Sequence, residues 1–311
     1  MACVPGVRGG VCEVAMNAAL PEGVVRDLRE ATLEDRWMLE RGRVYMNGTQ
    51  AILRLAMLQR QRDQMAGHST AGFISGYRGS PLGTVDLQAA KARAFLEAAH
   101  VRFQAGVNED LAATSVWGTQ QVNMYPGARY AGVFGLWYGK GPGVDRCGDV
   151  FKHANAAGTS PLGGVLAFAG DDHGAKSSTL PHQSDHIFKA CMMPVLYPAN
   201  VQEYLDLGLH GFAMSRYAGV WVGVKVVTDI VEASSAVMVD PDRVSIALPT
   251  DFVLPEGGLN IRWPDTPLAQ EARLLDFKLY AALAYCRANR LNQTVMDSPQ
   301  ARFGIDRKSV V

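Results

Sequence analysis

The amino-acid sequence predicts an α/β fold of three layers, in which helices cover both faces of a parallel β-sheet. Short apolar runs with strand character alternate with helix-like segments over most of the chain. The runs are almost continuously apolar instead of alternating between polar and apolar residues, which is typical of strands buried on both faces of a sheet. The predicted strands comprise residues 71–76, 101–107, 131–138, 164–169, 194–197 and 220–227.

Helices are predicted where apolar residues recur three or four positions apart. The first begins near Gly48 and extends to about Met65. Further helices are predicted for residues 84–99, 109–124, 145–157, 185–190, 201–215 and 268–289.

Composition divides the chain into three parts. Residues 1–46 form an N-terminal arm, in which the charge-rich stretch 17–46 is either a surface arm or a first helix. Residues 47–240 form the α/β domain. Residues 241–311 contain a linker rich in proline and glycine, a helix, and the truncated start of a further domain. The beginning of the chain lacks the long apolar core of a signal peptide, and Met16 is a candidate for the true start.

The charge and cysteine content argue against several classes of protein. Lysine plus arginine equals aspartate plus glutamate, 30 against 30, so no net field attracts nucleic acid or an anionic membrane. The five cysteines include no C-x-x-C pair, which argues against disulfide, zinc and iron–sulfur sites. The densest apolar stretch, 217–231, carries Lys225 and Asp229 and is too short to cross a membrane. We therefore expect a cytoplasmic protein with reduced thiols.

Polar residues follow the first two predicted strands, and ligands bind at the carboxyl ends of the strands in such sheets. In the turn 76–83, Arg78 is a candidate partner for an anion and Ser80 a candidate helix cap. A tight strand-to-helix turn is the simpler interpretation. In residues 106–114, Glu109 opens the next helix. Taken alone, this glutamate is explained by its favourable interaction with the helix N-terminus.

The third and fourth strands are followed by two further loops. Residues 139–149 are rich in glycine but match neither phosphate-binding glycine motif, so we expect a loop that shapes a pocket. Residues 170–186 are the most polar segment of the domain and contain His173, His182 and His186. The spacing of these histidines does not favour a metal site, and we expect a substrate-binding loop with no metal held by this chain.

Taken together, these strand ends resemble one family. Asn108 and Glu109 resemble the signature of the pyrimidine-binding domain of thiamine-diphosphate enzymes. The turn G-Y-R-G-S-P at residues 76–81 resembles that of 2-oxoacid:ferredoxin oxidoreductases, with arginine for proline and serine for threonine. The loop 171–185 resembles their polar loop. The resemblance is stronger still to the fused bacterial indolepyruvate ferredoxin oxidoreductases and extends over residues 31–305.

The resemblance implies roles for particular residues. Glu109 would be the catalytic carboxylate, hydrogen-bonded to the aminopyrimidine N1′ of thiamine diphosphate, where it favours the tautomer that accepts the thiazolium C2 proton. Asn108 and Gly79 would bind the cofactor beside it. The candidates for binding substrate are Arg78, Ser80 and His182.

The resemblance also implies components that lie outside this chain. The Gly-Asp-Gly…Asn motif that holds the diphosphate through Mg²⁺ is absent from the sequence, as are the cysteines that bind clusters. Magnesium and iron–sulfur clusters are therefore expected on other domains of a longer enzyme. That enzyme would convert an aryl 2-oxoacid to an acyl-CoA and pass the electrons to ferredoxin. The expected partners are those domains or subunits, ferredoxin, coenzyme A, the 2-oxoacid and further copies of the chain in a homo-oligomer.

Two alternative interpretations remain at this point. The chain is a non-catalytic truncated fragment or assembly module of such an enzyme, or it belongs to a thiamine-diphosphate decarboxylase that does not use ferredoxin. The second alternative requires the same diphosphate motif that the sequence lacks.

Overall fold

A computed structural model describes residues 31–175 and 180–303. The candidate start at Met16 and most of the predicted arm lie outside the described residues. The chain divides into two compact units, Met1–Asp35 and Arg36–Val311. In the described part of the first unit, both the backbone N–H and the hydroxyl of Thr32 donate to the Asp35 carboxylate, at 2.9 and 2.7 Å. All elements of the main sheet belong to the second unit.

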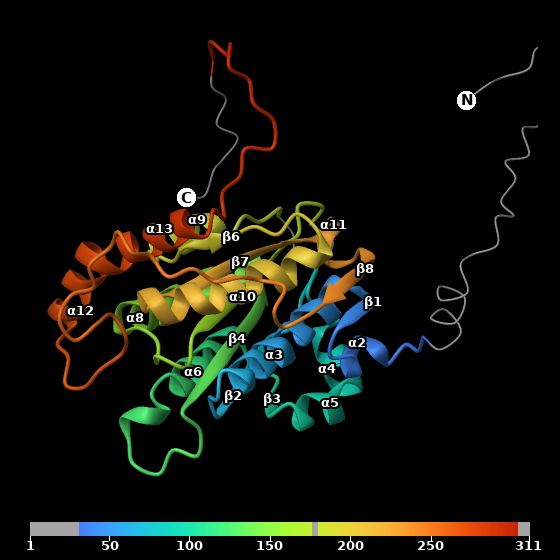
Figure 1. The fold of residues 1–311 in the computed structure, drawn as a ribbon, viewed down its shortest axis with the longest axis horizontal. Coiled ribbons are helices and arrows are strands. Elements are labelled where there is room, and N and C mark those ends of the chain that lie inside the picture. The colour runs from blue at the N-terminus through green and yellow to red at the C-terminus, as the bar shows by residue number, and fades with distance from the viewer. Residues whose placement is uncertain (1–30, 176–179, 304–311) are drawn as a thin grey trace, which may run out of the picture. The chain divides into compact units, whose positions relative to one another are not determined.

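The main sheet has six strands, all parallel, in the order β3-β2-β4-β5-β7-β6 (Figure 1). The strands are β2 (Thr70–Gly76), β3 (Val101–Phe103), β4 (Gly132–Lys140), β5 (Val165–Asp171), β6 (Val195–Leu196) and β7 (Trp221–Val227). Each overlaps one of the predicted strands. The α/β fold with a parallel sheet flanked by helices is therefore confirmed.

Helical segments connect the strands, and four predicted helices prove to be interrupted. Residues 84–99 form two helices that meet at Ala92, and residues 145–157 are divided at Cys147. Residues 109–124 form a helix followed by a separate 3-10 turn, and residues 268–289 contain a π-helical turn. The helices are α2 (Asp35–Met38), α3 (Gly48–Met65), α4 (Val85–Lys91), α5 (Arg93–Ala98), α6 (Glu109–Thr119), η1 (Val122–Met124), α7 (Gly141–Arg146), α8 (Gly148–Ala157), α9 (Asp185–Ala190), α10 (Val201–Ala218), α11 (Thr228–Val231), α12 (Pro267–Arg273), η2 (Leu274–Lys278) and α13 (Leu279–Ala288).

Both faces of the sheet are buried, which explains why its strands are almost continuously apolar. On one face, Phe134 and Leu136 of β4 belong to a core built with α3, α4, α5 and α10. On the other face, Trp137 packs in a second core with α6, α7, α8 and α9. Successive residues of one strand thus enter different cores, as the two-residue period of a strand requires.

A second, two-stranded sheet was not predicted. Strand β1 (Gly42–Asn47) pairs antiparallel with β8 (Ser234–Val239), and Gly42 lies opposite Val239. The prediction of a surface arm or first helix up to residue 46 is therefore wrong for this stretch. Val44 and Met46 are buried whereas Arg43 and Tyr45 are exposed, an alternation that marks a half-buried strand.

The helix α3 begins directly after β1 because its first turn is capped. The Asn47 side chain accepts a hydrogen bond from the Gln50 N–H at 2.8 Å, and the Gln50 side chain accepts one from the Asn47 N–H at 3.0 Å. This reciprocal capping box satisfies two backbone donors that the helix itself leaves unpaired. Among the described residues, no helix is long and apolar enough to cross a membrane.

A lysine is buried between the π-helical turn and the end of α8. The Lys278 side chain is fully buried, and its ammonium donates to the carbonyl oxygens of Ala156 at 2.8 Å and Asn155 at 3.3 Å. These carbonyls belong to the last turn of α8, where cations are favoured. Desolvation nevertheless dominates and lowers the pKa of Lys278 to about 7.

We predict that Lys278 makes the free energy of unfolding rise with pH above 7. Between the folded pKa of about 7 and the unfolded value of 10.5, the unfolded chain binds the extra proton, so raising the pH favours the folded state. Between pH 7 and 8.5 the gain should reach about 1–2 kcal/mol. Urea denaturation of wild type and Lys278→Met at several pH values measures it. Parallel pH dependences in the two proteins would contradict the prediction.

Candidate functional site

The four polar loops predicted from the sequence follow strands that are neighbours in the sheet. Strands β3, β2, β4 and β5 are adjacent and parallel, so their carboxyl ends share one edge. The chain leaves β2 toward β3 on one side and then returns to β4 on the other. This reversal makes the ends of β2 and β4 the topological switch point, where open α/β sheets bind ligands.

Glu109 is fixed at this edge by its own backbone and by the residue before it. The chain leaves β3 alongside β2, with the Gly106 N–H donating to the Gly76 carbonyl at 2.8 Å. Asn108 then caps α6, because its side chain accepts a hydrogen bond from the Leu111 N–H at 2.8 Å. Glu109 is the first residue of the helix, and its carbonyl accepts a hydrogen bond from the Trp137 indole at 3.1 Å.

The Glu109 side chain is buried but has no polar partner among the described residues. Only 8% of the residue is exposed, and its carboxylate makes no hydrogen bond or ion pair with this part of the chain. The adjacent Asp110 differs, because it is paired with Arg146 at 2.7 Å. A Cβ at Gly143 would lie 2.6 Å from the Glu109 Cγ, so the side chain lies directly against the backbone of α7. The carboxylate is therefore held in place and remains available to a ligand.

Cys147, at the end of α7, is a packing residue. Its side chain is fully buried in the core that contains Trp137, and burial raises the pKa of its thiol. A raised pKa suppresses the thiolate that a nucleophile requires.

The turn after β2 packs across the ends of β4 and β5. A Cβ at Gly79 would lie 2.7 Å from the Lys140 Cδ, so the lysine side chain crosses this glycine closely. The Ser80 hydroxyl donates to the buried Asp172 carboxylate at 2.9 Å. Arg78 is exposed and makes no ion pair with the described residues.

His182 and Glu109 both contact the short helix α7, but they do so on different sides of it. Its Nε2 lies 2.7 Å from the Asp145 carboxylate, and its ring lies against Gly141. Residues two apart on a helix point in nearly opposite directions. Because Gly141 contacts His182 and Gly143 contacts Glu109, α7 lies between these two side chains.

A buried ionic cluster anchors the loop that carries His182. The Asp171 carboxylate accepts a hydrogen bond from the Ser184 N–H at 3.0 Å. The Lys225 ammonium lies 3.5 Å from Asp171 and 3.4 Å from Asp185. Desolvation raises the pKa of Asp171. Within the described ranges, no group of three histidine, cysteine, aspartate or glutamate side chains could hold a metal ion.

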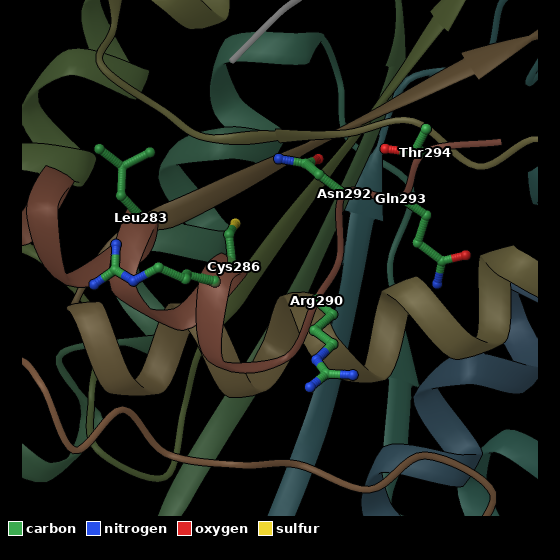
Figure 2. Close-up of a pocket in the computed structure, with 7 residues that line it drawn as sticks. Leu283, Cys286, Arg290, Asn292, Gln293 and Thr294 are labelled. Atoms are coloured by element: carbon green, nitrogen blue, oxygen red, sulfur yellow. The ribbon is translucent and has the colours of Figure 1, made fainter. Parts of the chain in front are cut away.

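Two pockets in the described structure lie away from these residues. One, of about 820 Å³, is formed by α13 and the segment after it; Figure 2 shows Leu283 and Cys286 on the helix and Asn292 to Thr294 beyond it. The other, of about 920 Å³, lies along the edge strand β3. Neither is lined by Glu109. The candidate site is defined by the polar groups at the sheet edge.

Several residues at this edge were not singled out from the sequence. Gly143 and Asp145 contact predicted site residues, and Lys140 contacts Gly79. The glycine-rich letters G-K-G-P-G indicated a loop that shapes a site, but they did not indicate which side chains it would contact.

We predict that Gly143→Ala destabilises the protein because the new Cβ would collide with Glu109. Alanine normally stabilises a helix by about 1 kcal/mol relative to glycine, whereas overpacking costs about 1–3 kcal/mol. In a Glu109→Ala background the collision disappears, and the same change should stabilise. The matched control is Gly148→Ala in α8, where the new Cβ would meet nothing within 4 Å. Chemical denaturation measures all four variants, and an equal effect of Gly143→Ala in both backgrounds would contradict the prediction.

Comparison with known proteins identifies the fold. No protein-family model matches the chain, and no curated protein matches it. A solved structure with a similar fold is the 2-oxoglutarate:ferredoxin oxidoreductase from Magnetococcus marinus with 2-oxoglutarate, coenzyme A and succinyl-CoA bound. The TM-score is 0.55 at 15% sequence identity, and the match covers 78% of this chain but 45% of that one. At this identity the likeness shows the fold alone: the parallel α/β architecture of this chain occurs in a 2-oxoacid:ferredoxin oxidoreductase.

Proposed function

We propose that this chain is the part of a 2-oxoacid:ferredoxin oxidoreductase that activates thiamine diphosphate, and that the substrate is indolepyruvate or a related aryl 2-oxoacid. The fold supports the enzyme class, because it is similar to that of a 2-oxoglutarate:ferredoxin oxidoreductase. The preference for an aryl substrate rests on the sequence resemblance. The residues at the strand ends support the assignment of a site to this chain.

The observation that carries the proposal is the state of the Glu109 carboxylate. The stem of this side chain is buried, but its carboxylate oxygens are not among the fully enclosed polar atoms of the described residues, so they remain accessible to a ligand. Glu109 is 8% exposed and has no hydrogen-bond partner for its carboxylate among the described residues. A bound group with a hydrogen-bonding ring nitrogen would satisfy it.

The contacts around Glu109 restrict where its carboxylate can lie. The Glu109 side chain packs against Gly143, and the preceding residue Asn108 caps the helix that Glu109 begins. The Glu109 backbone is anchored by the Trp137 indole. A rigidly held carboxylate can meet the N1′ atom of the aminopyrimidine ring without reorganisation, which is the condition for efficient proton transfer.

When bound, thiamine diphosphate would supply a carbon nucleophile for the 2-oxo group and would hold the electron pair left when carbon dioxide departs. Glu109 would share a proton with N1′ of the ring and so favour the tautomer that accepts the C2 proton. Asn108 and Gly79 shape the approach to this position. Arg78, Ser80 and His182 are the proposed substrate-binding residues, although α7 separates His182 from Glu109.

The remaining components are proposed to lie on other domains or subunits. These are the Mg²⁺ site for the diphosphate, the iron–sulfur clusters, and the surfaces for coenzyme A and ferredoxin. The chain spans less than half the length of the structure it matches. Residues 47–240 are the proposed pyrimidine-binding domain, and assembly as a homo-oligomer would place it beside the missing parts.

We predict that Glu109→Gln in the assembled enzyme lowers 2-oxoacid-dependent ferredoxin reduction by at least about 100-fold, because loss of a general acid–base group costs about 10²–10⁴ in rate. Exchange of the C2 proton of bound thiamine diphosphate for deuterium, followed by NMR, should slow by a similar factor.

The matched control is Glu97→Gln on α5, where the carboxylate is exposed and pairs with Arg93 on the same helix. This variant should exchange and reduce ferredoxin as the wild type does. Near-normal exchange in Glu109→Gln would show that the assignment of Glu109 is wrong.

The choice of substrate is tested separately. We expect kcat/KM for indolepyruvate to exceed that for pyruvate and for 2-oxoglutarate by at least about tenfold, a difference of about 1.4 kcal/mol in transition-state binding. Steady-state ferredoxin reduction with each acid measures the ratios. A preference for 2-oxoglutarate would reject the aryl substrate while leaving the enzyme class intact.

A further inference from the structure

We propose that Lys140 binds the carboxylate of the 2-oxoacid substrate, and that Gly79 is required because it lets the Lys140 side chain reach that position. This inference rests on the proposed function and adds a specificity-determining residue to the same site. It adds the lysine to Arg78 and Ser80, which the sequence resemblance gave as candidates for contacting that carboxylate.

The first support is the place of Lys140 in the fold. It is the last residue of β4, and it lies opposite Gly170 of β5 in the parallel ladder. The neighbouring strand on the other side is β2, so Lys140 stands at the switch point where ligands bind. Other cations of the domain, such as Lys225 in its buried ion cluster, are already paired.

The second support is the close contact with Gly79. A Cβ there would lie 2.7, 3.0 and 3.2 Å from the Cδ, Cγ and Cβ of Lys140. Three successive carbons of the lysine thus run along the glycine backbone. Such a contact restricts the path of a side chain that is otherwise flexible, and it directs the lysine stem along the turn after β2.

The third support is that the Lys140 ammonium has no acidic partner among the described residues. The residue is half-buried, and its ammonium makes no hydrogen bond or ion pair with the described residues. The nearby acidic groups have other partners: Asp172 accepts from Ser80, Asp145 is bonded to His182, and Asp86 accepts from the Tyr138 hydroxyl. A half-buried cation at a ligand-binding edge is a natural partner for an anion.

Ser80 is less suited to this role because of its own hydrogen bond. Its hydroxyl proton is donated to Asp172 and is therefore not available to a substrate carboxylate. A carboxylate accepts hydrogen bonds and cannot donate them. An anionic substrate bound at this turn therefore needs a cationic partner. Lys140 at the end of β4 can provide it, as can the exposed Arg78 in the turn itself.

The test measures binding without turnover in the assembled enzyme. Indole-3-lactate carries the carboxylate but has a hydroxyl in place of the 2-oxo group, and its methyl ester lacks the charge. Lys140→Met keeps the side-chain stem and removes the charge. By calorimetry, it should weaken binding of indole-3-lactate by about 10- to 100-fold and leave binding of the ester within about twofold.

Two further variants separate charge from packing. Lys140→Arg should retain most of the affinity for indole-3-lactate. Gly79→Ala should lower this affinity, because the new Cβ displaces the lysine stem, and should have little additional effect in the Lys140→Met background. The matched control is Lys91→Met in the last turn of α4, an exposed lysine that should leave the affinity unchanged.

The possible outcomes are distinguishable. Equal weakening of the acid and the ester in Lys140→Met would overturn the inference in favour of a packing role. Loss of affinity for coenzyme A alone, titrated in the same way, would overturn it in favour of a phosphate site. Normal acid binding in Lys140→Met, together with slow C2 exchange in Glu109→Gln, would reject only the role of Lys140. Normal exchange in Glu109→Gln would reject the proposed function itself.

Discussion

The position of β2 between β3 and β4 is the constraint on which the candidate site depends. Parallel pairing requires the chain to cross over a face of the sheet before each new strand, so every strand ends at the same edge. Because β2 has β3 on one side and β4 on the other, the turn with Gly79, the helix that begins at Glu109 and the loop that follows Lys140 become neighbours. The contacts of Gly79 and Gly143 follow from this order.

The fold class could be predicted because strands that are buried on both faces of a sheet are almost continuously apolar in sequence. The strands around Phe134 and Leu136 contribute to two cores and therefore contain few polar residues. The pair β1–β8 could not be found in the same way. Strand β1 is buried on one side only, so its apolar residues Val44 and Met46 alternate with Arg43 and Tyr45 inside a charged region. The break at Ala92 was missed because no glycine or proline marks it.

The local sequence also predicts only part of the candidate site, because the rest depends on contacts between distant segments. The place of Glu109 at a helix start is a local property, because the Asn108 cap belongs to the same turn. The contact of Lys140 with Gly79 is not local, since it depends on the register between two strands and on the path of the intervening loops. Single-sequence patterns carry no such register, so the partners of the predicted residues emerged only from the structure.

The pairing of β1 with β8 also sets how the domain responds to mechanical load. The chain enters the ladder at Gly42 and leaves it at Val239, and these two residues lie opposite each other. A force applied through the two flanking segments therefore acts at one end of an antiparallel ladder, where the hydrogen bonds are perpendicular to the strands. Once the flanking segments are free, the ladder would open one pair of residues at a time from the Gly42–Val239 end.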